Sequence, residues 1–330
     1  MKQLFKPLDY FFVLRPTLFY PVWTVFLAGF FVQNKYGVAA NNSAASHHFL
    51  GTNGIAFIWV GLFLTMLMGA VFILNQIMDR KTDNKNQKLF LIAHGYLTPK
   101  SAFIESAALI AIAVIFAFIF SIKMGFLFLG ILILTGWLYS FEPFKLKDRP
   151  LLGLVANGLG ALLIFFGGWM IRGVLTQESI IYSIPYVCSV AAVYLLTTLP
   201  DVEGDASTQK QTFGVKFGFK TTVYFALFFE VVALVLSFFS KDELMFYPAL
   251  FSLPFFIWAS ITLKMIEVQR AVKYSILLLT FTICVKWITI YSNAAFSFKY
   301  AYFFLLMGVY FLSKIYYKVR FGLTYPSLSV

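Results

Sequence analysis

The chain has 330 residues, of which 60% are hydrophobic and only 12% are charged. This composition excludes a soluble globular domain and is typical of an integral membrane protein. The formal net charge is +12, but the basic residues are spread among short polar segments instead of forming one patch, so nucleic acid is not an expected partner.

Apolar runs follow one another along the whole chain, each about long enough to form a transmembrane helix. The last run differs from the others because it contains Ser313, Lys314 and paired tyrosines, which are typical of a membrane interface. No polar block is large enough for a separate domain, so residues 1–330 are expected to form a single all-α membrane domain. The ten runs lie near residues 17–33, 55–76, 101–121, 124–140, 151–171, 180–199, 221–239, 245–264, 273–291 and 299–316.

Two further features of the chain limit its chemistry. Cys188 and Cys284 lie inside apolar runs and lack CxxC spacing or a Cys/His partner, so we expect both to be packing residues. The N-terminal stretch lacks a small-residue cleavage site after its first apolar run. We therefore expect no cleaved signal peptide.

Lys and Arg residues gather in alternate connections. The N-terminal segment, the connections after the second, fourth, sixth and eighth runs, and the segment after the tenth run hold most of the 26 basic residues. Because Lys and Arg accumulate on the cytoplasmic side of membrane proteins, we expect the N-terminus and these connections to be cytoplasmic. The pattern predicts a multi-pass protein of the cell (inner) membrane, in contact with membrane lipids.

Two of these connections begin with acidic motifs. Asn75, Asp79 and Asp83 close the second run at intervals of four residues, and they share one face if the segment is helical. Asp201 and Asp205 close the sixth run with the same spacing. Carboxylate and amide oxygens are the ligands that Mg²⁺ prefers, and two facing acidic clusters suit a diphosphate with bridging metal ions. The alternative interpretation of the first motif is a solvated helix end.

Basic residues accompany both acidic motifs and fill the connection after the fourth run. Cations in these positions can neutralise a bound diphosphate. They are Arg80 and Lys81 after the first motif, Lys145 and Lys147 in the segment that starts at Tyr139-Ser140, and Lys210 after the second motif.

In this order, the two acidic motifs and the segment from Tyr139 through Pro143 to Lys147 resemble the UbiA superfamily of intramembrane prenyltransferases. The resemblance extends from Arg15-Pro16 to Gly218. It implies a bundle of nine or ten transmembrane helices around a central cavity open to the cytoplasmic side. It also implies Mg²⁺-dependent transfer of a polyprenyl group from a prenyl diphosphate to a small aromatic, tetrapyrrole or lipid-precursor acceptor, with release of diphosphate.

The resemblance also implies residue roles. Asn75, Asp79 and Asp83 would hold one metal ion and Asp201 with Asp205 another, and the four aspartates would be catalytic. The diphosphate would be bound by the remaining polar residues of these segments, which are Lys145, Lys147, Lys210, Arg80, Lys81 and Tyr139.

The chain departs from the family pattern in two places. Phe90-Leu91 and His94-Gly95 stand where relatives often have Arg-Pro and Ser-Gly, and Gln209 stands where many have Gly. The form Asp201-Val-Glu-Gly-Asp205 resembles the homogentisate, chlorophyll and archaeal-lipid branches more than the 4-hydroxybenzoate branch.

Two alternative functions and the roles of two charged residues remain open from the sequence. Paired membrane carboxylates also occur in cation-coupled secondary transporters, although transporter sites usually lie near the bilayer midplane. A lyase or cyclase could ionise the same diphosphate without an acceptor. Within the apolar runs, Glu230 and Lys286 are expected either to pair with each other or to serve the acceptor side.

Overall fold

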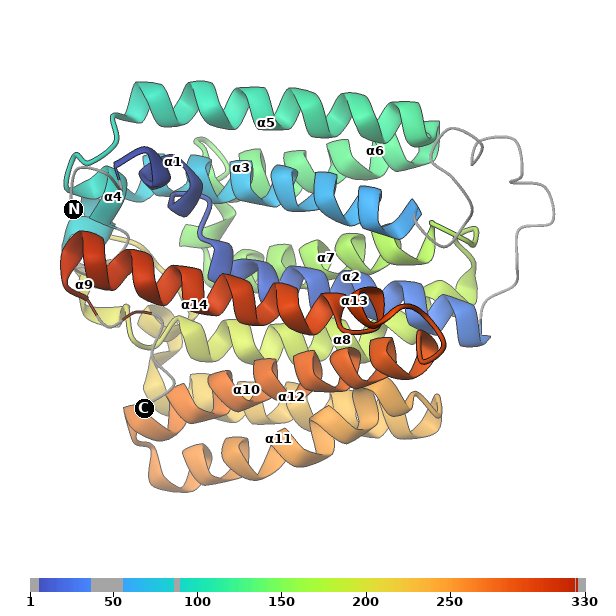
Figure 1. The fold of residues 1–330 in the computed structure, drawn as a ribbon. Coiled ribbons are helices and arrows are strands. Elements are labelled where there is room, and N and C mark those ends of the chain that lie inside the picture. The colour runs from blue at the N-terminus through green and yellow to red at the C-terminus, as the bar shows by residue number, and fades with distance from the viewer. Residues whose placement is uncertain (1–5, 37–55, 86–89, 324, 326–330) are drawn as a thin grey trace.

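A computed structural model describes residues 6–36, 56–85, 90–323 and 325. These residues form helices joined by short connections, and no β-strand occurs among them. Each of the ten apolar runs becomes a helix, so the expected all-α fold is confirmed. Figure 1 shows the long helices lying roughly side by side in one bundle. The long helices are α2 (Phe19–Tyr36), α3 (Ala56–Lys85), α5 (Pro99–Phe120), α6 (Ile122–Ile131) with the π-helical continuation Leu132–Leu138, α7 (Pro150–Trp169), α8 (Gln177–Thr197), α10 (Phe213–Phe239), α11 (Glu243–Thr262), α12 (Met265–Ile290) and α14 (Ala301–Phe321).

Within the described ranges, eight helical segments are long and apolar enough to cross a membrane by length and composition. The segment Ile122–Leu138 is apolar but shorter, and α14 does not meet the same criteria. The helices make the chain a multi-pass integral membrane protein, and the expected count of nine or ten spans is approximate. Four short helices lie between or before the long ones: α1 (Asp9–Phe12), α4 (Phe90–Ala93), α9 (Val202–Ser207) and α13 (Phe296–Lys299).

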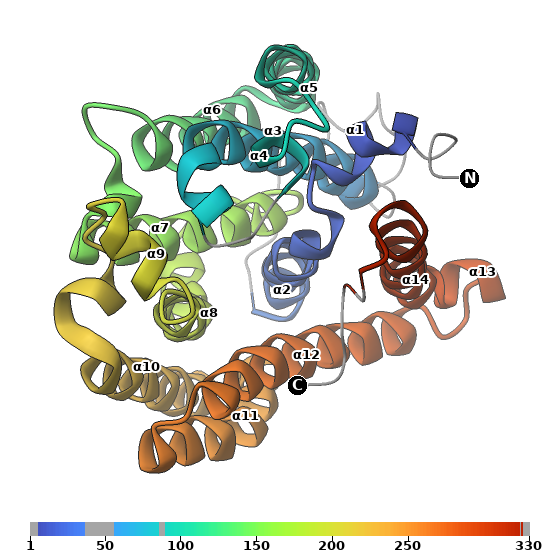
Figure 2. The same ribbon diagram turned by 90° about the vertical axis from the view of Figure 1, so that its left-hand side faces the viewer.

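The long helices pack mainly against their neighbours in sequence. Helix α2 also packs against helices that are distant from it in sequence. It contacts α7 closely and also meets α3, α8 and α12, as the view along the helices shows (Figure 2). The C-terminal helix α14 packs beside α12 and the start of α2. Buried Asp9 ties it to the N-terminal segment by accepting hydrogen bonds from Tyr316 Oη (2.6 Å) and Arg320 Nη2 (2.9 Å).

Two glycines allow the backbones of α2 and α7 to approach each other. A Cβ atom on Gly29 would collide with the carbonyl oxygen of Phe165, and one on Gly168 would collide with that of Phe26. Because these neighbours are backbone atoms, rotation of a side chain cannot relieve the collision. Small residues serve this purpose at helix contacts in membranes.

The Gly168→Ala substitution should lower the free energy of unfolding by about 1–3 kcal/mol, because α2 and α7 must separate to admit one methyl group. Gly308→Ala in α14 is the matched control, since a Cβ atom there meets nothing within 4 Å. Thermal unfolding of both variants in the same detergent measures the difference. Equal melting temperatures for the two variants would contradict the close contact.

The structure contradicts one expectation about the polar residues of the apolar runs, the pairing of Glu230 with Lys286. Glu230 accepts a hydrogen bond from Ser252 Oγ of α11 at 2.5 Å, and no ion pair joins it to Lys286. The expected pairing of these two residues is wrong because Glu230 faces α11, whereas Lys286 is carried by α12. Cys188 and Cys284 are buried and free, which agrees with their expected role in packing.

Candidate active site

A cavity of about 640 Å³ lies within the bundle and is bordered by residues from α2, α3, α7, α8 and α12. Charged and polar side chains line one end, near the last turns of α3 and α8. The rest of the wall is largely apolar. The polar end contains all five residues of the acidic motifs together with two lysines: Asn75, Asp79, Asp83, Asp201, Asp205, Lys147 and Lys210.

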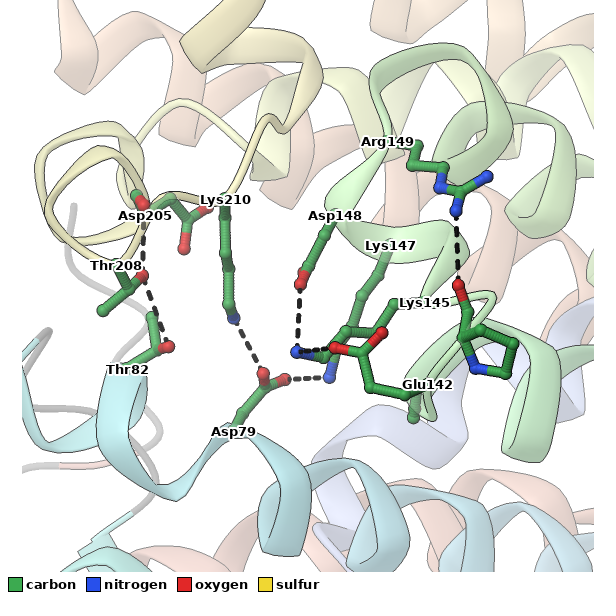
Figure 3. Close-up of polar contacts among 12 residues, drawn as sticks. Asp79, Thr82, Glu142, Lys145, Lys147, Asp148, Arg149, Asp205, Thr208 and Lys210 are labelled. Atoms are coloured by element: carbon green, nitrogen blue, oxygen red, sulfur yellow. Dashed lines mark hydrogen bonds and ion pairs between the residues drawn. The ribbon is translucent and has the colours of Figure 1, made fainter.

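Asp79 is the centre of this polar end. Lys147 Nζ lies 2.8 Å from Asp79 Oδ2, and Lys210 Nζ lies 2.7 Å from Asp79 Oδ1. Figure 3 shows the two lysines approaching the carboxylate from different sides. All three side chains are largely buried, with exposed fractions of 13% for Asp79, 7% for Lys147 and 14% for Lys210. Segments distant in sequence therefore meet at one carboxylate.

Tight turns bring the two lysines to Asp79. Lys145 adopts a left-handed conformation (φ 40°) and starts the 3₁₀ turn Leu146–Asp148, which directs Lys147 into the cavity before α7 begins at Pro150. Gln209 also has a positive φ (61°), and the Lys210 backbone N–H donates to the Asp205 carbonyl at 3.0 Å. This turn after α9 carries Lys210 back over α3.

The two lysines respond differently to their surroundings. Burial lowers the pKa of Lys147, and the nearby Asp79 offsets this effect only in part. Burial also lowers the pKa of Lys210, but the nearby carboxylates, Asp79 foremost, together outweigh it, and the pKa of Lys210 is raised overall. Both ammonium groups form their ion pair with the same carboxylate, so an anionic ligand at this end of the cavity would gain two preplaced cations.

Asn75 extends the polar cluster by one helical turn. With its amide oriented so that both atoms are satisfied, the nitrogen donates to Asp79 Oδ2 at 3.3 Å. Its oxygen then accepts from Lys147 Nζ and from Ser140 Oγ, both at 3.3 Å. Asn75 therefore orients the first motif and contacts the segment after the fourth apolar run.

Two further carboxylates are poised for a cation. Asp83 is buried, and its Oδ2 atom has no hydrogen-bond partner among the described residues. Asp205 is also buried, and burial raises its pKa to about 6, with Lys210 opposing and Asp201 adding to the rise. A buried carboxylate oxygen without a partner is costly, and a metal ion would satisfy it.

The donor set fits Mg²⁺ bound together with a ligand. No group of three or more Asp, Glu, His or Cys side chains within the described ranges is close enough to hold a metal ion alone. Mg²⁺ usually takes one or two carboxylates and completes its shell with water and phosphate oxygens. Two separate pairs of aspartates suit that mode of binding, whereas an all-protein cage would need a denser cluster.

The other sequence-predicted residues are placed as follows. Tyr139 lines the cavity, and its hydroxyl accepts a hydrogen bond from Asn157 Nδ2 at 3.2 Å. Lys145 lies outside the cavity lining, and its Nζ is 3.0 Å from Glu142 Oε1 and 3.6 Å from Asp148 Oδ2. The structure places Arg80 and Lys81 at a different pocket, described below.

Sequence reasoning did not assign a role to Arg15, which lines the cavity beside Asp83. Its left-handed backbone (φ 57°) immediately precedes Pro16, the first residue of the 3₁₀ turn Pro16–Leu18 that leads into α2. The Arg15-Pro16 pair marked only where the family resemblance begins. The signal in the sequence that could have identified Arg15 is a basic residue directly before a proline, at the start of the first apolar run.

Comparisons with known proteins identify a family for this chain. The profile of the UbiA prenyltransferase family matches residues 37–273. Among curated relatives, the digeranylgeranylglyceryl phosphate synthase of Methanospirillum hungatei is 27% identical over 186 residues, which are 55% of this chain and 64% of the relative. The enzyme of the same name from Natronomonas pharaonis is 26% identical over 172 residues, 51% of this chain and 60% of the relative. The chain thus spans less than two thirds of the length of these relatives.

Solved structures share the fold. A UbiA homologue from Archaeoglobus fulgidus bound to GPP and Mg²⁺ has a TM-score of 0.59 at 20% identity, and the match covers 84% of this chain and 99% of that one. The apo structure of a UbiA homologue from Aeropyrum pernix has a TM-score of 0.61 at 15% identity, with 81% and 96% covered. At these identities the likeness concerns the fold alone.

Proposed function

The chain belongs to the UbiA prenyltransferase family, and on this basis we propose that it transfers a polyprenyl group from a prenyl diphosphate to a small acceptor, with Mg²⁺, and releases diphosphate. The observation that carries the proposal is the division of one cavity of about 640 Å³ into a charged end and an apolar remainder. An amphiphilic donor needs this combination, since its diphosphate and its hydrocarbon chain require opposite surroundings.

The charged end matches the chemistry of the leaving group. A departing diphosphate carries roughly three negative charges, and its C–O bond breaks readily only when that charge is stabilised. We assign metal binding to Asn75, Asp79 and Asp83 on α3 and to Asp201 and Asp205 after α8. Bound Mg²⁺ supplies Lewis-acid stabilisation of the phosphate oxygens.

The lysines supply charge that does not depend on the metal. Lys147 and Lys210 hold their ammonium groups beside Asp79 in a largely buried place. There they can donate to diphosphate oxygens with little screening by solvent. Their fixed position before the ligand arrives is the kind of preorganisation that favours the transition state.

The apolar wall serves the hydrocarbon chain. It excludes water from an allylic carbocation-like fragment, which would otherwise be hydrolysed. The side chains come from α2, α3, α7 and α12 and include Val22, Val25, Met68, Phe72, Ile164 and Leu279.

For the acceptor we propose a lipid precursor of the glyceryl phosphate type in preference to an aromatic or tetrapyrrole acceptor. The names of the curated relatives support this choice, since they describe synthases of a geranylgeranylated glyceryl phosphate. The Asp201-Val-Glu-Gly-Asp205 form of the second motif disfavours only the 4-hydroxybenzoate branch, so the choice rests on the names of the relatives. We further propose that the protein resides in the cell membrane with the charged end of the cavity at the cytoplasmic face.

The transporter alternative is disfavoured by where the charges lie. Asp79 and Asp83 occupy the last two turns of α3, and Asp201 and Asp205 follow the end of α8. Coupling sites of secondary transporters usually lie near the bilayer midplane. A cluster at helix ends suits a ligand whose charged part stays at the membrane surface.

A product assay tests the proposal. Purified protein would be incubated with Mg²⁺ and geranylgeranyl diphosphate, and with geranylgeranylglyceryl phosphate, homogentisate, 4-hydroxybenzoate or no acceptor, followed by mass spectrometry. We expect a prenylated product with the glyceryl phosphate. Consumption of the donor at the same rate without an acceptor would favour a lyase or cyclase, and a product formed only with an aromatic acceptor would overturn the acceptor assignment.

A further inference from the structure

A second pocket, of about 480 Å³, lies at the end of α3 between that helix and the connection from α4 to α5. Its lining includes Arg80, Lys81 and Asn84 from α3, and His94, Gly95 and Thr98 from the connection. We call it the basic pocket. Neither the metal ligands nor the lysines of the active site contribute to it.

Helix geometry separates the basic pocket from the active site. Successive residues of an α-helix turn by about 100°, so residues one and two positions after Asp79 face away from it, while the residue four positions later faces the same way. Asp79 and Asp83 accordingly line the active-site cavity, and Arg80 and Lys81 line the basic pocket. One helix end thus presents carboxylates on one side and cations on the other.

The basic pocket carries positive charge without local compensation. None of its lining residues is Asp or Glu. Within the described part of the chain, Arg80 and Lys81 form no ion pair, whereas Lys147, Lys210 and Arg320 are each paired with a carboxylate. Arginine and lysine side chains that converge on a cavity without a carboxylate provide donors for an anion, and the arginine fork matches phosphate oxygens.

A helix end adds to the positive potential. The 22-residue helix α5 starts at Pro99, directly after Thr98, whose hydroxyl accepts a hydrogen bond from the Ser101 backbone N–H at 3.1 Å. Thr98 and Pro99 both line the basic pocket, so the positive end of the helix dipole lies at its wall. The dipole supplements the two cationic side chains.

The neighbouring surface of α5 is suited to lipid. Phe103 is 54% exposed and Ile104 is 60% exposed, about one turn beyond Thr98. A phosphate in the basic pocket would therefore lie where an apolar, outward-facing helix surface begins. This is the position of a phospholipid headgroup relative to its acyl chains.

We propose that the basic pocket binds a phosphate-bearing anion, either the headgroup of an anionic phospholipid or free phosphate. The bound anion would fix the last turns of α3 from the side opposite the active site. Because Arg80 and Lys81 stand between Asp79 and Asp83 in the chain, the ligand would hold the backbone that positions these carboxylates. The proposal concerns binding and does not depend on the reaction proposed above.

Native mass spectrometry of the full-length protein with added phosphatidylglycerol tests this proposal. The double variant Arg80→Gln and Lys81→Gln should bind phosphatidylglycerol at least about tenfold more weakly, since both charge-assisted hydrogen bonds to the phosphate are lost. The control variant Lys216→Gln and Lys220→Gln removes two exposed cations from α10, which line neither pocket. It should bind as the wild type does.

Two further experiments distinguish a lipid headgroup from free phosphate and test the pocket with a second variant in case the double variant does not fold. Inorganic phosphate in place of the lipid should raise the melting temperature of the wild type but not of the double variant if free phosphate is the ligand. Asn84→Asp, which adds a carboxylate to the pocket at an exposed position, should weaken binding in the same direction. Equal binding of both phosphatidylglycerol and phosphate by the wild type, the double variant and the control would overturn the proposal.

Discussion

The Asp79→Asn variant should lose prenyl transfer by about 100- to 1000-fold or more, the range seen when a preorganised electrostatic group is removed from a transition state. Asp79 is the residue around which the charged end of the cavity is built, with Lys147 at 2.8 Å and Lys210 at 2.7 Å. The substitution preserves shape but removes the charge that we assign to metal binding. It also leaves two buried ammonium groups without their carboxylate. Initial rates of diphosphate release at saturating Mg²⁺ measure the effect.

Glu243→Gln is the matched control for the loss of one carboxylate. Glu243 starts α11, and its side chain is 70% exposed and 3.7 Å from Lys35. The control should retain wild-type rates, because an exposed pair contributes little. Elution as a single species on size exclusion and an unchanged helical circular dichroism signal would establish that the Asp79 variant is folded. Wild-type activity in such a folded variant would remove Asp79 from the site.

Replacing Lys147 by Ala should lower kcat/KM for the prenyl diphosphate by about 100-fold, because the buried, charge-assisted contact that we propose between Lys147 and the diphosphate would be lost. Lys145→Ala is a matched control two residues away. Lys145 lies outside the cavity lining and contacts Glu142 and Asp148. The control should change kcat/KM by no more than about threefold, as expected for a partly exposed ion pair.

Steady-state kinetics with geranylgeranyl diphosphate separate these two lysines. A larger loss in the Lys145 variant than in the Lys147 variant would show that the turn after the fourth apolar run presents the other residue to the donor. Equal small losses in both would remove this segment from diphosphate binding. The comparison thus tests the direction in which the 3₁₀ turn Leu146–Asp148 aims its side chains.

Periodicity predicted the parts of the site that lie on regular helices. Asn75, Asp79 and Asp83 are spaced at four residues, and all three line the cavity together, as one face of a helix requires. The same rule places Arg80 and Lys81 on another side of α3. Assigning them to the diphosphate followed from their proximity in sequence, and helix geometry would have separated them.

The geometry of two turns determines which basic side chains reach the cavity, and the sequence alone does not predict this. Lys145 and Lys147 have the same chemistry, but only Lys147 lines the cavity. The left-handed backbone conformation of Lys145, which only the folded connection reveals, separates the directions of the two side chains. Likewise, Gln209 adopts a positive φ without being Gly, and this turn delivers Lys210 to Asp79. Charge and spacing identified the segments of the candidate site, whereas tertiary contacts determine which side chain of each segment lines the cavity.

Contacts between distant helices were the least predictable. Glu230 and Lys286 are opposite charges within apolar runs, which suggested a pair, but Ser252 on α11 takes the place of the lysine. Arg15 reaches the cavity through a bend before α2 that has no periodic signal. Such contacts depend on which helices are neighbours, and a single sequence does not encode that order in a local pattern.

The dependence of diphosphate release on divalent metal tests the proposed function. Purified wild-type protein would be given geranylgeranyl diphosphate and a glyceryl phosphate acceptor, and release would be measured before and after chelation of divalent metal. We predict release in the presence of Mg²⁺, loss of release on addition of EDTA, and recovery when excess Mg²⁺ is restored. A folded protein that releases no diphosphate from any prenyl donor at any Mg²⁺ concentration would contradict the proposed function.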